Sequence, residues 1–260
     1  MGKKKLSEQV VVVAGGSYGL GRAIVRAVAD RGAKVAIALA LVVTYVFHNR
    51  LLHWLNRPLP HRVRPPTTFG VAEPFLTTFW VAIWAAVLLA LPVILWQIWS
   101  FLAPAFDESA QRAVRWLVLG ATVLGIAGLA FGYFIVLPPA IHFLTNYGRS
   151  NFHVLIRARD YYGFVSAALI AVTLVFEVPL FILGLIRLRV LSAEKLRRSR
   201  RVGYVIMFAL AVALPGVDPV TTTIEGVALL ILFEATIWIA LALDRRWRAE
   251  ATRPATIPEP

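Results

Sequence analysis

The chain has 260 residues, 59% of them hydrophobic, and a mean hydropathy of +0.72. A soluble domain is roughly 45–50% apolar, so the composition excludes a soluble globular protein and indicates an integral membrane protein. The formal net charge of +13 would suggest nucleic acid as the partner of a soluble protein, but these basic residues lie between apolar runs, where membrane topology explains them. With no cysteine and five scattered histidines, the sequence predicts neither disulfides nor a metal site.

Residues 1–34 are set apart as an atypical N-terminal segment. The apolar run Val10–Ala14, followed by the glycine-rich stretch Gly15–Gly21, resembles the start of a short-chain dehydrogenase/reductase. A strand, a glycine turn and a helix start would hold a pyrophosphate at the helix N-terminus. The resemblance stops near Lys34, without the further parallel strands that a dinucleotide site requires. We therefore expect a non-functional fragment that binds no cofactor.

Six apolar segments follow along the chain. None shows the period-2 alternation of barrel strands, so six transmembrane helices are predicted. The segments are Val35–Phe47 (extended through Leu55), Phe75–Trp99, Trp116–Leu137, Tyr161–Ile186, Val202–Val217 and Val220–Leu243. The membrane domain is accordingly predicted over residues 35–244, with a disordered cytoplasmic tail over 245–260.

The distribution of basic residues predicts the orientation. Six spans place both termini on one side, and 20 of the 27 Lys and Arg residues fall in segments on that side. Basic residues are enriched in cytoplasmic loops, so both termini are predicted to be cytoplasmic.

Glu177 is the most unusual residue of the fourth segment. It is the one charged residue in the 26 residues from Tyr161 to Ile186. A carboxylate at such a depth costs about 2.5–3.5 kcal/mol on insertion scales, and a group this costly is by default a functional hypothesis. The alternative is a polar residue that only holds helices together. On the functional hypothesis, Glu177→Ala should insert normally and impair activity.

The fifth segment is short. Its 16 residues span about 24 Å as a helix, less than the roughly 30 Å hydrocarbon core. The turn Pro215–Pro219 then leads into the sixth segment. Either the bilayer thins locally around this pair of helices, or the mismatch is merely tolerated.

Five motifs occur in order along these segments. They are Leu91–Trp99 followed by Phe101–Ala105, Phe131–Pro138, Phe176–Pro179, Leu214–Pro219 and Leu232–Glu234. The series resembles TatC, the multispanning receptor of the twin-arginine protein translocase, over about residues 36–245. The resemblance implies an all-α membrane protein, with six transmembrane helices in a concave cup, both termini cytoplasmic, in the cytoplasmic membrane of a prokaryote.

The resemblance also implies a function without catalysis or cofactor. TatC-like proteins bind the twin-arginine signal peptides of folded proteins and use the proton gradient for export. The implied partners are single-span TatA and TatB-like proteins, membrane lipid and further copies of the chain in a receptor complex, with no nucleic acid. The residues that match the family's binding positions are Phe101, Pro104, Glu177, Asp218 and Glu234.

The chain departs from the family in its first cytoplasmic loop. The family's loop glutamate falls on Ala110, and Glu108 is the nearest acidic substitute. Simpler interpretations also stay open for three of the other residues: Phe101 as an interfacial anchor, Asp218 as a helix cap, and Glu234 as half of a buried polar pair.

Two other functions compete with the translocase. A proton-coupled transporter of small solutes would use Glu177, Glu225 and Glu234 as proton carriers, but no internal repeat is visible. A membrane-tethered reductase would require a complete nucleotide-binding fold, which is missing from the sequence.

Overall fold

The computed structural model describes residues 10–11, 34–35, 37–102, 108–147, 150, 155–187, 190–216 and 218–251. Apart from the two-residue strands β1 (Val10–Val11) and β2 (Lys34–Val35), which pair in parallel, the regular elements described are helices. These are α2 (Ile37–Val46), α3 (His48–Leu55), the 3-10 helix η2 (His61–Val63), α4 (Glu73–Leu102), α5 (Glu108–Phe131), the π-helix η4 (Gly132–Val136), α6 (Leu137–Asn146), α7 (Ala158–Phe176), α8 (Val178–Arg187), α9 (Ala193–Arg198), α10 (Arg200–Ala213) and α11 (Pro219–Ala251).

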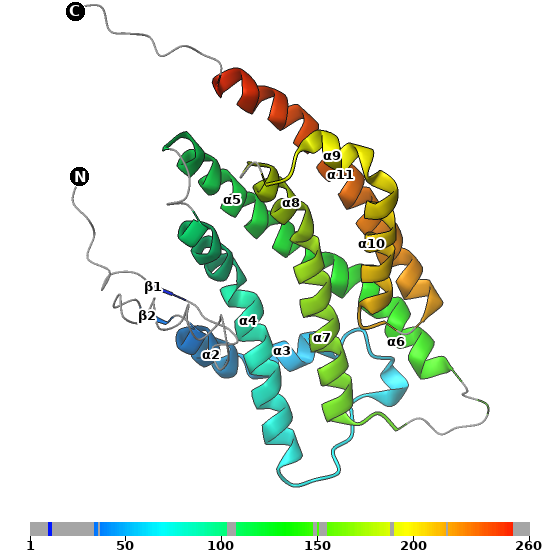
Figure 1. The fold of residues 1–260 in the computed structure, drawn as a ribbon. Helices are drawn as coiled ribbons and strands as arrows, with labels where there is room; N and C mark the ends of the chain where they lie inside the picture. The colour runs from blue at the N-terminus through cyan, green and yellow to red at the C-terminus, as the bar shows by residue number, and fades with distance from the viewer. Residues whose placement is uncertain are drawn as a thin grey trace, which may run out of the picture.

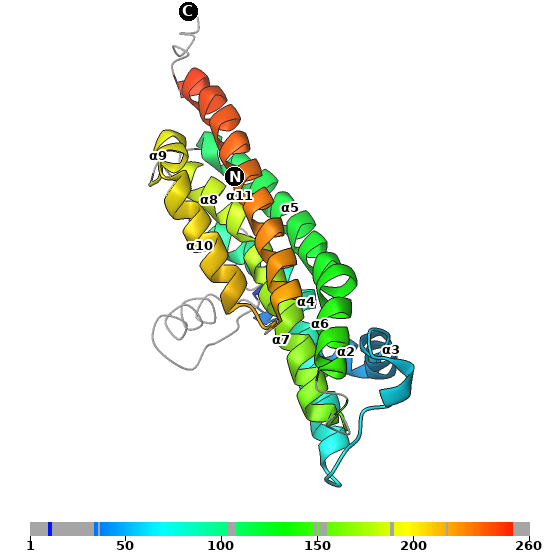
Figure 2. The ribbon, with the colours of Figure 1, turned by 90° about the vertical axis from the view of Figure 1, so that its right-hand side faces the viewer.

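The long helices form a bundle with a common direction. Helix α4, the continuous unit α5–η4–α6, the unit α7–α8 and the pair α10–α11 run side by side along one axis (Figures 1 and 2). Four stretches are long and apolar enough to cross a membrane: Glu73–Leu95, Leu119–Asn146, Ala158–Arg187 and Pro219–Asp244. The chain is an all-helical membrane protein, as the composition predicted.

The first and fifth predicted segments are helical but short. The first is divided at Phe47 into α2, with 10 residues, and α3, with 8 residues. The fifth, α10, has 14 residues and ends at Ala213. It ends there because Leu214 precedes Pro215 and takes the extended backbone, with ψ 151°, that a following proline favours.

The break between α7 and α8 falls on Glu177 and follows from Pro179. A proline at position 179 has no N–H for the carbonyl of Val175, so the regular helix cannot continue through this turn. Instead the N–H of Glu177 donates to Leu174 at 3.1 Å, and the N–H groups of Leu180 and Phe181 both donate to the Glu177 carbonyl. Both backbone groups of Glu177 are thereby hydrogen-bonded across the break.

The third segment continues further than predicted, through η4 and α6 to Asn146. Pro138 and Pro139 lie in the first turn of α6 and lack the donors that an α-helix requires. The preceding five residues take the wider π-helical spacing, in which the N–H of Leu137 donates to Gly132. The apolar run therefore passes two prolines without ending.

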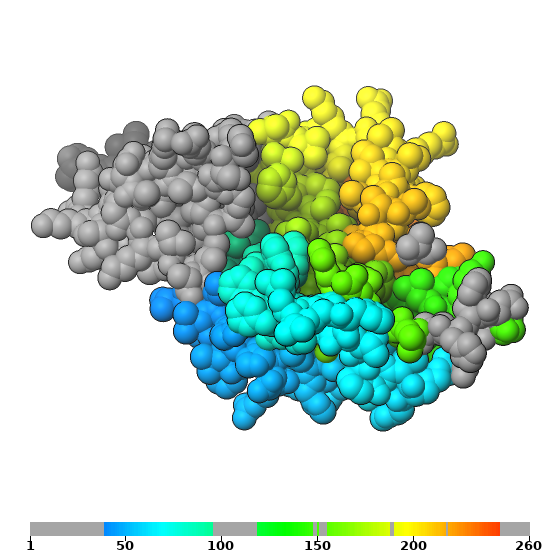
Figure 3. Space-filling view, turned by 90° about the horizontal axis from the view of Figure 1, so that it is seen from below, coloured from blue at the N-terminus to red at the C-terminus, as the bar shows by residue number. Residues whose placement is uncertain are grey.

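The α10–α11 turn stops short of one end of the bundle. In both side views it lies well inside the level reached by the start of α4, the end of α6 and the start of α7 (Figures 1 and 2). Figure 3 looks onto that end. The segment of α2 and α3 and the following loop, in blue and cyan, lie along one edge, α7 in green lies between, and α10 and α11 in yellow and orange lie along the other.

Three tyrosines attach the end of α3 to the bundle. The hydroxyl of Tyr133 donates to the carbonyl of Trp54 at 2.7 Å, and that of Tyr161 donates to the carbonyl of Leu55 at 2.6 Å. The hydroxyl of Tyr162 bonds to the side-chain oxygen of Asn56 at 2.9 Å. The last carbonyls of a helix have no partner within it, so the bond from Tyr161 satisfies a Leu55 carbonyl that would otherwise be costly to bury.

The contact between α5 and α7 depends on a glycine. A Cβ on Gly128 would lie 2.7 Å from Phe176 Cβ and 3.2 Å from Thr173 Cα. Both of these atoms belong to or adjoin the backbone, so neither can move aside without displacing the helix.

We therefore expect Gly128→Ala to lower the free energy of unfolding by about 1–3 kcal/mol through overpacking. Gly163→Ala is the matched control, because a Cβ on Gly163 meets no atom within 4 Å and should be neutral or slightly stabilising. Unfolding by detergent titration in mixed micelles measures both. Equal effects of the two substitutions would contradict the proposed contact.

Candidate functional site

Glu177 is buried between three helices. Its side chain is 7% exposed, and its Oε1 lies 2.7 Å from the point that a Cβ on Gly125 of α5 would occupy. A methyl group of Leu91, on α4, lies 3.1 Å from the same point. Neither carboxylate oxygen has a hydrogen-bond partner among the described residues. The structure therefore places this carboxyl group against a bare stretch of α5 backbone, in apolar surroundings.

Asp218 caps the first turn of α11. Its Oδ1 accepts a hydrogen bond from the backbone N–H of Thr221 at 2.7 Å, and Pro219 occupies the first helical position. Both features are typical of helix N-termini. Asp218 is 1% exposed and its second oxygen, Oδ2, has no partner among the described residues. Capping thus uses only half of the carboxylate.

Glu234 joins α11 to α10. It accepts a hydrogen bond from the hydroxyl of Tyr204, and its Oε2 lies 3.4 Å from the guanidinium of Arg200. The same guanidinium lies over the ring of Trp238, 5.7 Å from its centroid. Of the three buried or half-buried carboxylates predicted from the sequence, this one has a charged partner. Each of the three has its own neighbours, so the structure does not bring them together in one site.

The predicted signal-peptide residues lie at the junction of α4 and α5. Phe101 belongs to the last turn of α4, and Glu108 is the first residue of α5. Their side chains, and Pro104, lie outside the described residues. The backbone from Glu108 through Ala110 is helical. Positions two apart on a helix are separated by about 200° around its axis, so Glu108 and Ala110 lie on different faces of α5.

Sequence reasoning missed an ion pair at the opposite end of the bundle. Arg157, just before α7, donates to Glu73 Oε1 at 2.7 Å, and the backbone N–H of Phe69 donates to Glu73 Oε2 at 2.9 Å. The hydrogen bond between Arg157 and Glu73, together with the charge of Glu73, raises the pKa of Arg157, so the guanidinium stays charged. A β-bridge between Thr67 and Arg157 joins the same two loops. The available signal was a glutamate directly before Pro74 at a helix start.

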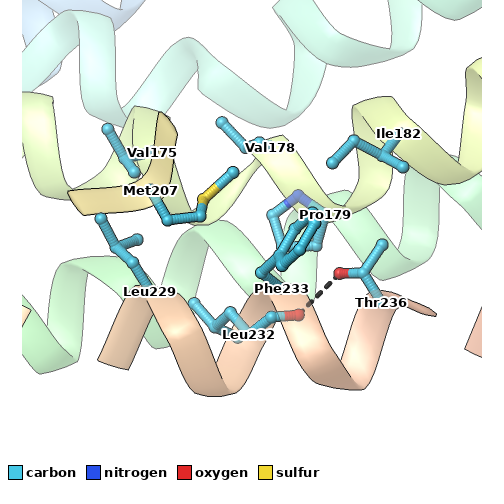
Figure 4. A pocket seen from close by; sticks show the side chains of 9 residues that line it. All are labelled: Val175, Val178, Pro179, Ile182, Met207, Leu229, Leu232, Phe233 and Thr236. Atoms are coloured by element: carbon cyan, nitrogen blue, oxygen red, sulfur yellow. Dashed lines mark hydrogen bonds between the residues drawn. The ribbon is translucent and has the colours of Figure 1, made fainter. Parts of the chain in front are cut away.

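The space between α7–α8, α10 and α11 is an apolar contact and not a binding site. Figure 4 shows the side chains that line it, which come from α7 and α8 (Val175, Val178, Pro179 and Ile182), α10 (Met207) and α11 (Leu229, Leu232, Phe233 and Thr236). The one hydroxyl present, on Thr236, already donates to the carbonyl of Leu232 at 2.7 Å. Nothing in this gap could recognise a polar solute.

The described residues provide no ligand set for a metal site. They contain no group of three or more His, Cys, Asp or Glu side chains arranged to hold a metal ion. The carboxyl groups that lack partners can bind protons or attract cationic groups.

Comparison with known proteins agrees with this description. Residues 25–227 match the family described as Sec-independent protein translocase protein (TatC). The chain belongs to the TatC family. It is 32% identical over 207 residues to the Sec-independent protein translocase protein TatC of Carboxydothermus hydrogenoformans, covering 79% of this chain and 85% of the relative. The TatC of Escherichia coli K12 is 30% identical over 209 residues, with 79% and 81% covered.

A solved structure of this family has the same fold. The crystal structure of the twin-arginine translocase receptor TatC in the detergent DDM superposes with a TM-score of 0.68 at 27% identity, covering 79% of this chain and 92% of that one. This TatC-family chain is therefore a protein-translocase subunit, a transport protein and not an enzyme.

One sequence interpretation finds no support in the comparisons. The family match begins at residue 25, inside the segment 1–34 that was set apart as atypical. The resemblance of residues 10–34 to a dehydrogenase start has no support in these matches.

We expect the contact between Glu234 and Tyr204 to contribute measurably to stability. Interhelical hydrogen bonds in membrane proteins average about 0.6 kcal/mol and reach about 1.7 kcal/mol. A double-mutant cycle of Tyr204→Phe with Glu234→Gln, measured by unfolding in mixed micelles, should give a coupling energy in this range. Pairing Tyr204→Phe with Asp160→Asn, at the distant start of α7, is the control and should give none. A vanishing coupling in the first cycle would mean that the two side chains do not interact.

Proposed function

We propose that the chain is the receptor subunit of a twin-arginine translocase. It binds the twin-arginine signal peptides of folded proteins at the cytoplasmic face of a prokaryotic membrane, for export driven by the proton gradient. The observation that carries the proposal is the fold match to a twin-arginine translocase receptor over 79% of the chain. Its partners are single-span TatA and TatB-like proteins, membrane lipid and further copies of the chain.

The topology proposed has six spans in a concave cup, with α2–α3 and α10 as the two short ones and both termini cytoplasmic. Two features support it. The basic helix α9 lies at the same end of the bundle as the α4–α5 junction and the C-terminal part of α11 (Figure 1). These are segments in which arginine and lysine gather, as expected of a cytoplasmic face.

We assign two roles to the predicted site residues. Phe101, Pro104 and Glu108 form the receptor loop for the signal peptide at the cytoplasmic end. The intramembrane carboxyl groups of Glu177, Asp218 and Glu234 contact the inserted peptide or partner helices. Glu177 is the strongest candidate, because it is buried and neither of its oxygens has a hydrogen-bond partner in the described part of the chain. A deeply placed carboxyl group of this kind costs insertion energy and is retained for a function.

The first test concerns the receptor loop. Because Glu108 and Ala110 occupy different faces of α5, Glu108 cannot simply replace a glutamate at position 110. An arginine guanidinium pairs best with a carboxylate in bidentate geometry. We expect Ala110→Glu to strengthen binding of a twin-arginine peptide by about 0.2–1 kcal/mol, as for an exposed ion pair.

The measurement is the affinity of the purified protein for a labelled twin-arginine peptide, with a twin-lysine peptide as the control. If the wild type and the Ala110→Glu variant both bind the two peptides equally well, the receptor loop has no role in recognising arginine.

The second test concerns the packing of Glu177 against the α5 backbone at Gly125. A Cβ on Gly125 would lie 2.7 Å from Glu177 Oε1, so Gly125→Ala must displace the carboxyl group. Gly120→Ala, on the same helix, serves as the control. A Cβ on Gly120 would meet only the two terminal methyl groups of the Leu180 side chain, at 3.2 and 3.8 Å. We expect Gly125→Ala to slow export of a twin-arginine reporter severalfold and Gly120→Ala to leave it nearly unchanged.

Combining Gly125→Ala with Glu177→Ala identifies the mechanism. The double variant should export no more slowly than Glu177→Ala alone, because the glycine acts through the glutamate. A further, independent loss would show that Gly125 matters for packing and not for the position of Glu177.

A further inference from the structure

A group of buried oxygen atoms lies at the start of α11. Asp218, Thr221 and Glu225, here called the turn cluster, are spaced three and four residues apart and so share one face of the helix. Each is 1% exposed or less. Asp218 Oδ2, Thr221 Oγ1 and both carboxylate oxygens of Glu225 have no hydrogen-bond partner among the described residues. Four buried oxygens without partners on one helix face require a chemical explanation.

The side chain of Glu225 extends back towards the α10–α11 turn. Its Oε2 lies 3.8 Å from the point that a Cβ on Gly216 would occupy, and Thr221 Cγ2 lies 3.2 Å from the same point. Side chains on a helix lean towards its N-terminus, which explains how a residue in the second turn reaches the turn before the helix. Glu225 and Thr221 therefore meet over Gly216, two positions before Asp218 in the same turn.

The surroundings of Glu225 beyond the cluster are apolar. The gap beside it is lined by side chains of α5, α7, α11 and the α10–α11 turn, among them Phe131, Val172, Phe176 and Leu229. Such surroundings disfavour a charged carboxylate unless a cation or several donors face it.

The titratable groups on the elements packed against α11 do not face Glu225. They contact other partners or lie elsewhere along the axis of the bundle. On α10, Arg200 and Tyr204 contact Glu234, and Arg201 lies in the same first turn, far from the α10–α11 turn. Tyr133 of η4 and Tyr161 and Tyr162 of α7 bond to the end of α3. The others are His142 beside Asn146 on α6, Arg159 and Asp160 at the start of α7, Glu177 against Gly125, Arg187 at the end of α8, and Glu194, Lys195, Arg197 and Arg198 on α9.

Electrostatics distinguishes the two acids of the turn cluster. Two neighbouring carboxylates in apolar surroundings cannot both ionise without a large cost. Asp218 is the one favoured as an anion, because it accepts the N–H of Thr221 and lies at the positive end of the α11 dipole. Glu225 has no donor from the described residues, so a proton on its carboxyl group removes the cost of burying its charge.

We propose that Glu225 is a proton-binding site, with its carboxylic acid hydrogen-bonded within the turn cluster to the ionised Asp218. Glu225 is 1% exposed, so no side chain of a partner protein can reach its carboxyl group in this conformation. Position 225 lies between the motifs Leu214–Pro219 and Leu232–Glu234 that carry the family resemblance and belongs to neither. The inference is independent of the proposed receptor function and concerns the purified protein without peptide.

Infrared difference spectroscopy tests this directly, because the C=O stretch of a protonated carboxylic acid is separated from the bands of carboxylates. At neutral pH we expect the wild type to show a protonated-acid band that is lost in Glu225→Gln. Glu234→Gln, whose carboxylate faces Arg200, should remove no such band. The spectrum of Glu177→Gln identifies the band of Glu177, whose buried oxygens also have no partner among the described residues, so that it can be told apart from the band of Glu225.

A second variant keeps the test decisive if Glu225→Gln fails to fold. Asp218→Asn should shift the frequency of the Glu225 band, because it replaces the charged acceptor of the acid proton, and should leave the Glu177 band in place. A wild type without a Glu225-dependent acid band overturns the proposal, as does a Glu225 band that Asp218→Asn leaves unmoved. Loss of the wild-type band on adding sodium or magnesium would assign the cluster to a metal cation and likewise refute proton binding.

Discussion

The constraint on which this structure depends is that a polar group inside a membrane protein must find its partner within the protein. Most of the chain obeys it. The end of α3 receives three tyrosine hydroxyls, the break at Glu177 keeps its backbone groups bonded, and the α11 N-terminus is capped by Asp218. Against this background, the carboxyl groups of Glu177 and Glu225 stand out, because their oxygens have no partner among the described residues. We propose that both groups serve function at the expense of stability, because a buried carboxyl group without a partner is costly.

Prolines determine where these exceptional groups lie. Pro179 ends α7 at Phe176, directly before Glu177. Pro215 ends α10 at Ala213, which brings the turn and Asp218 into the interior of the bundle. A proline costs a helix one hydrogen bond but directs the chain without requiring a loop. The short length of α10 and the position of the acidic turn that follows it are consequences of the same local chemistry.

Much of the fold could be predicted from the sequence, because long apolar runs are a direct signal of membrane helices. The predicted segments starting at Phe75, Tyr161 and Val220 begin within three residues of helices α4, α7 and α11. The depth of Glu177 and the capping potential of Asp218 were also readable, since both depend on nearby residues only. The third segment was predicted to end at Leu137, nine residues too early, because prolines usually end helices and here a π-helix accommodates them.

The contacts between helices could not be predicted in this way. A helix that is apolar on all sides has no face that periodicity can assign to the interior. Two of these contacts join residues distant in sequence: Glu177 packs against Gly125, and Glu234 pairs with Arg200. The burial of Glu225 depends on which face of α11 turns inward. For the same reason the glutamate before Pro74 could not by itself predict the ion pair of Glu73 and Arg157, which are separated by 84 positions.

The central claim is that the unpaired intramembrane carboxyl group of Glu177 serves transport at the expense of stability. Glu177→Leu tests it most directly when the free energy of unfolding and the export rate of a twin-arginine reporter are measured on the same variant. Replacing an unpaired buried acid by an apolar side chain of similar size removes a desolvation cost. The account predicts an unfolding free energy that is unchanged or higher, together with a large loss of export. A variant that loses stability in step with its export, or that exports at the full rate, would contradict it.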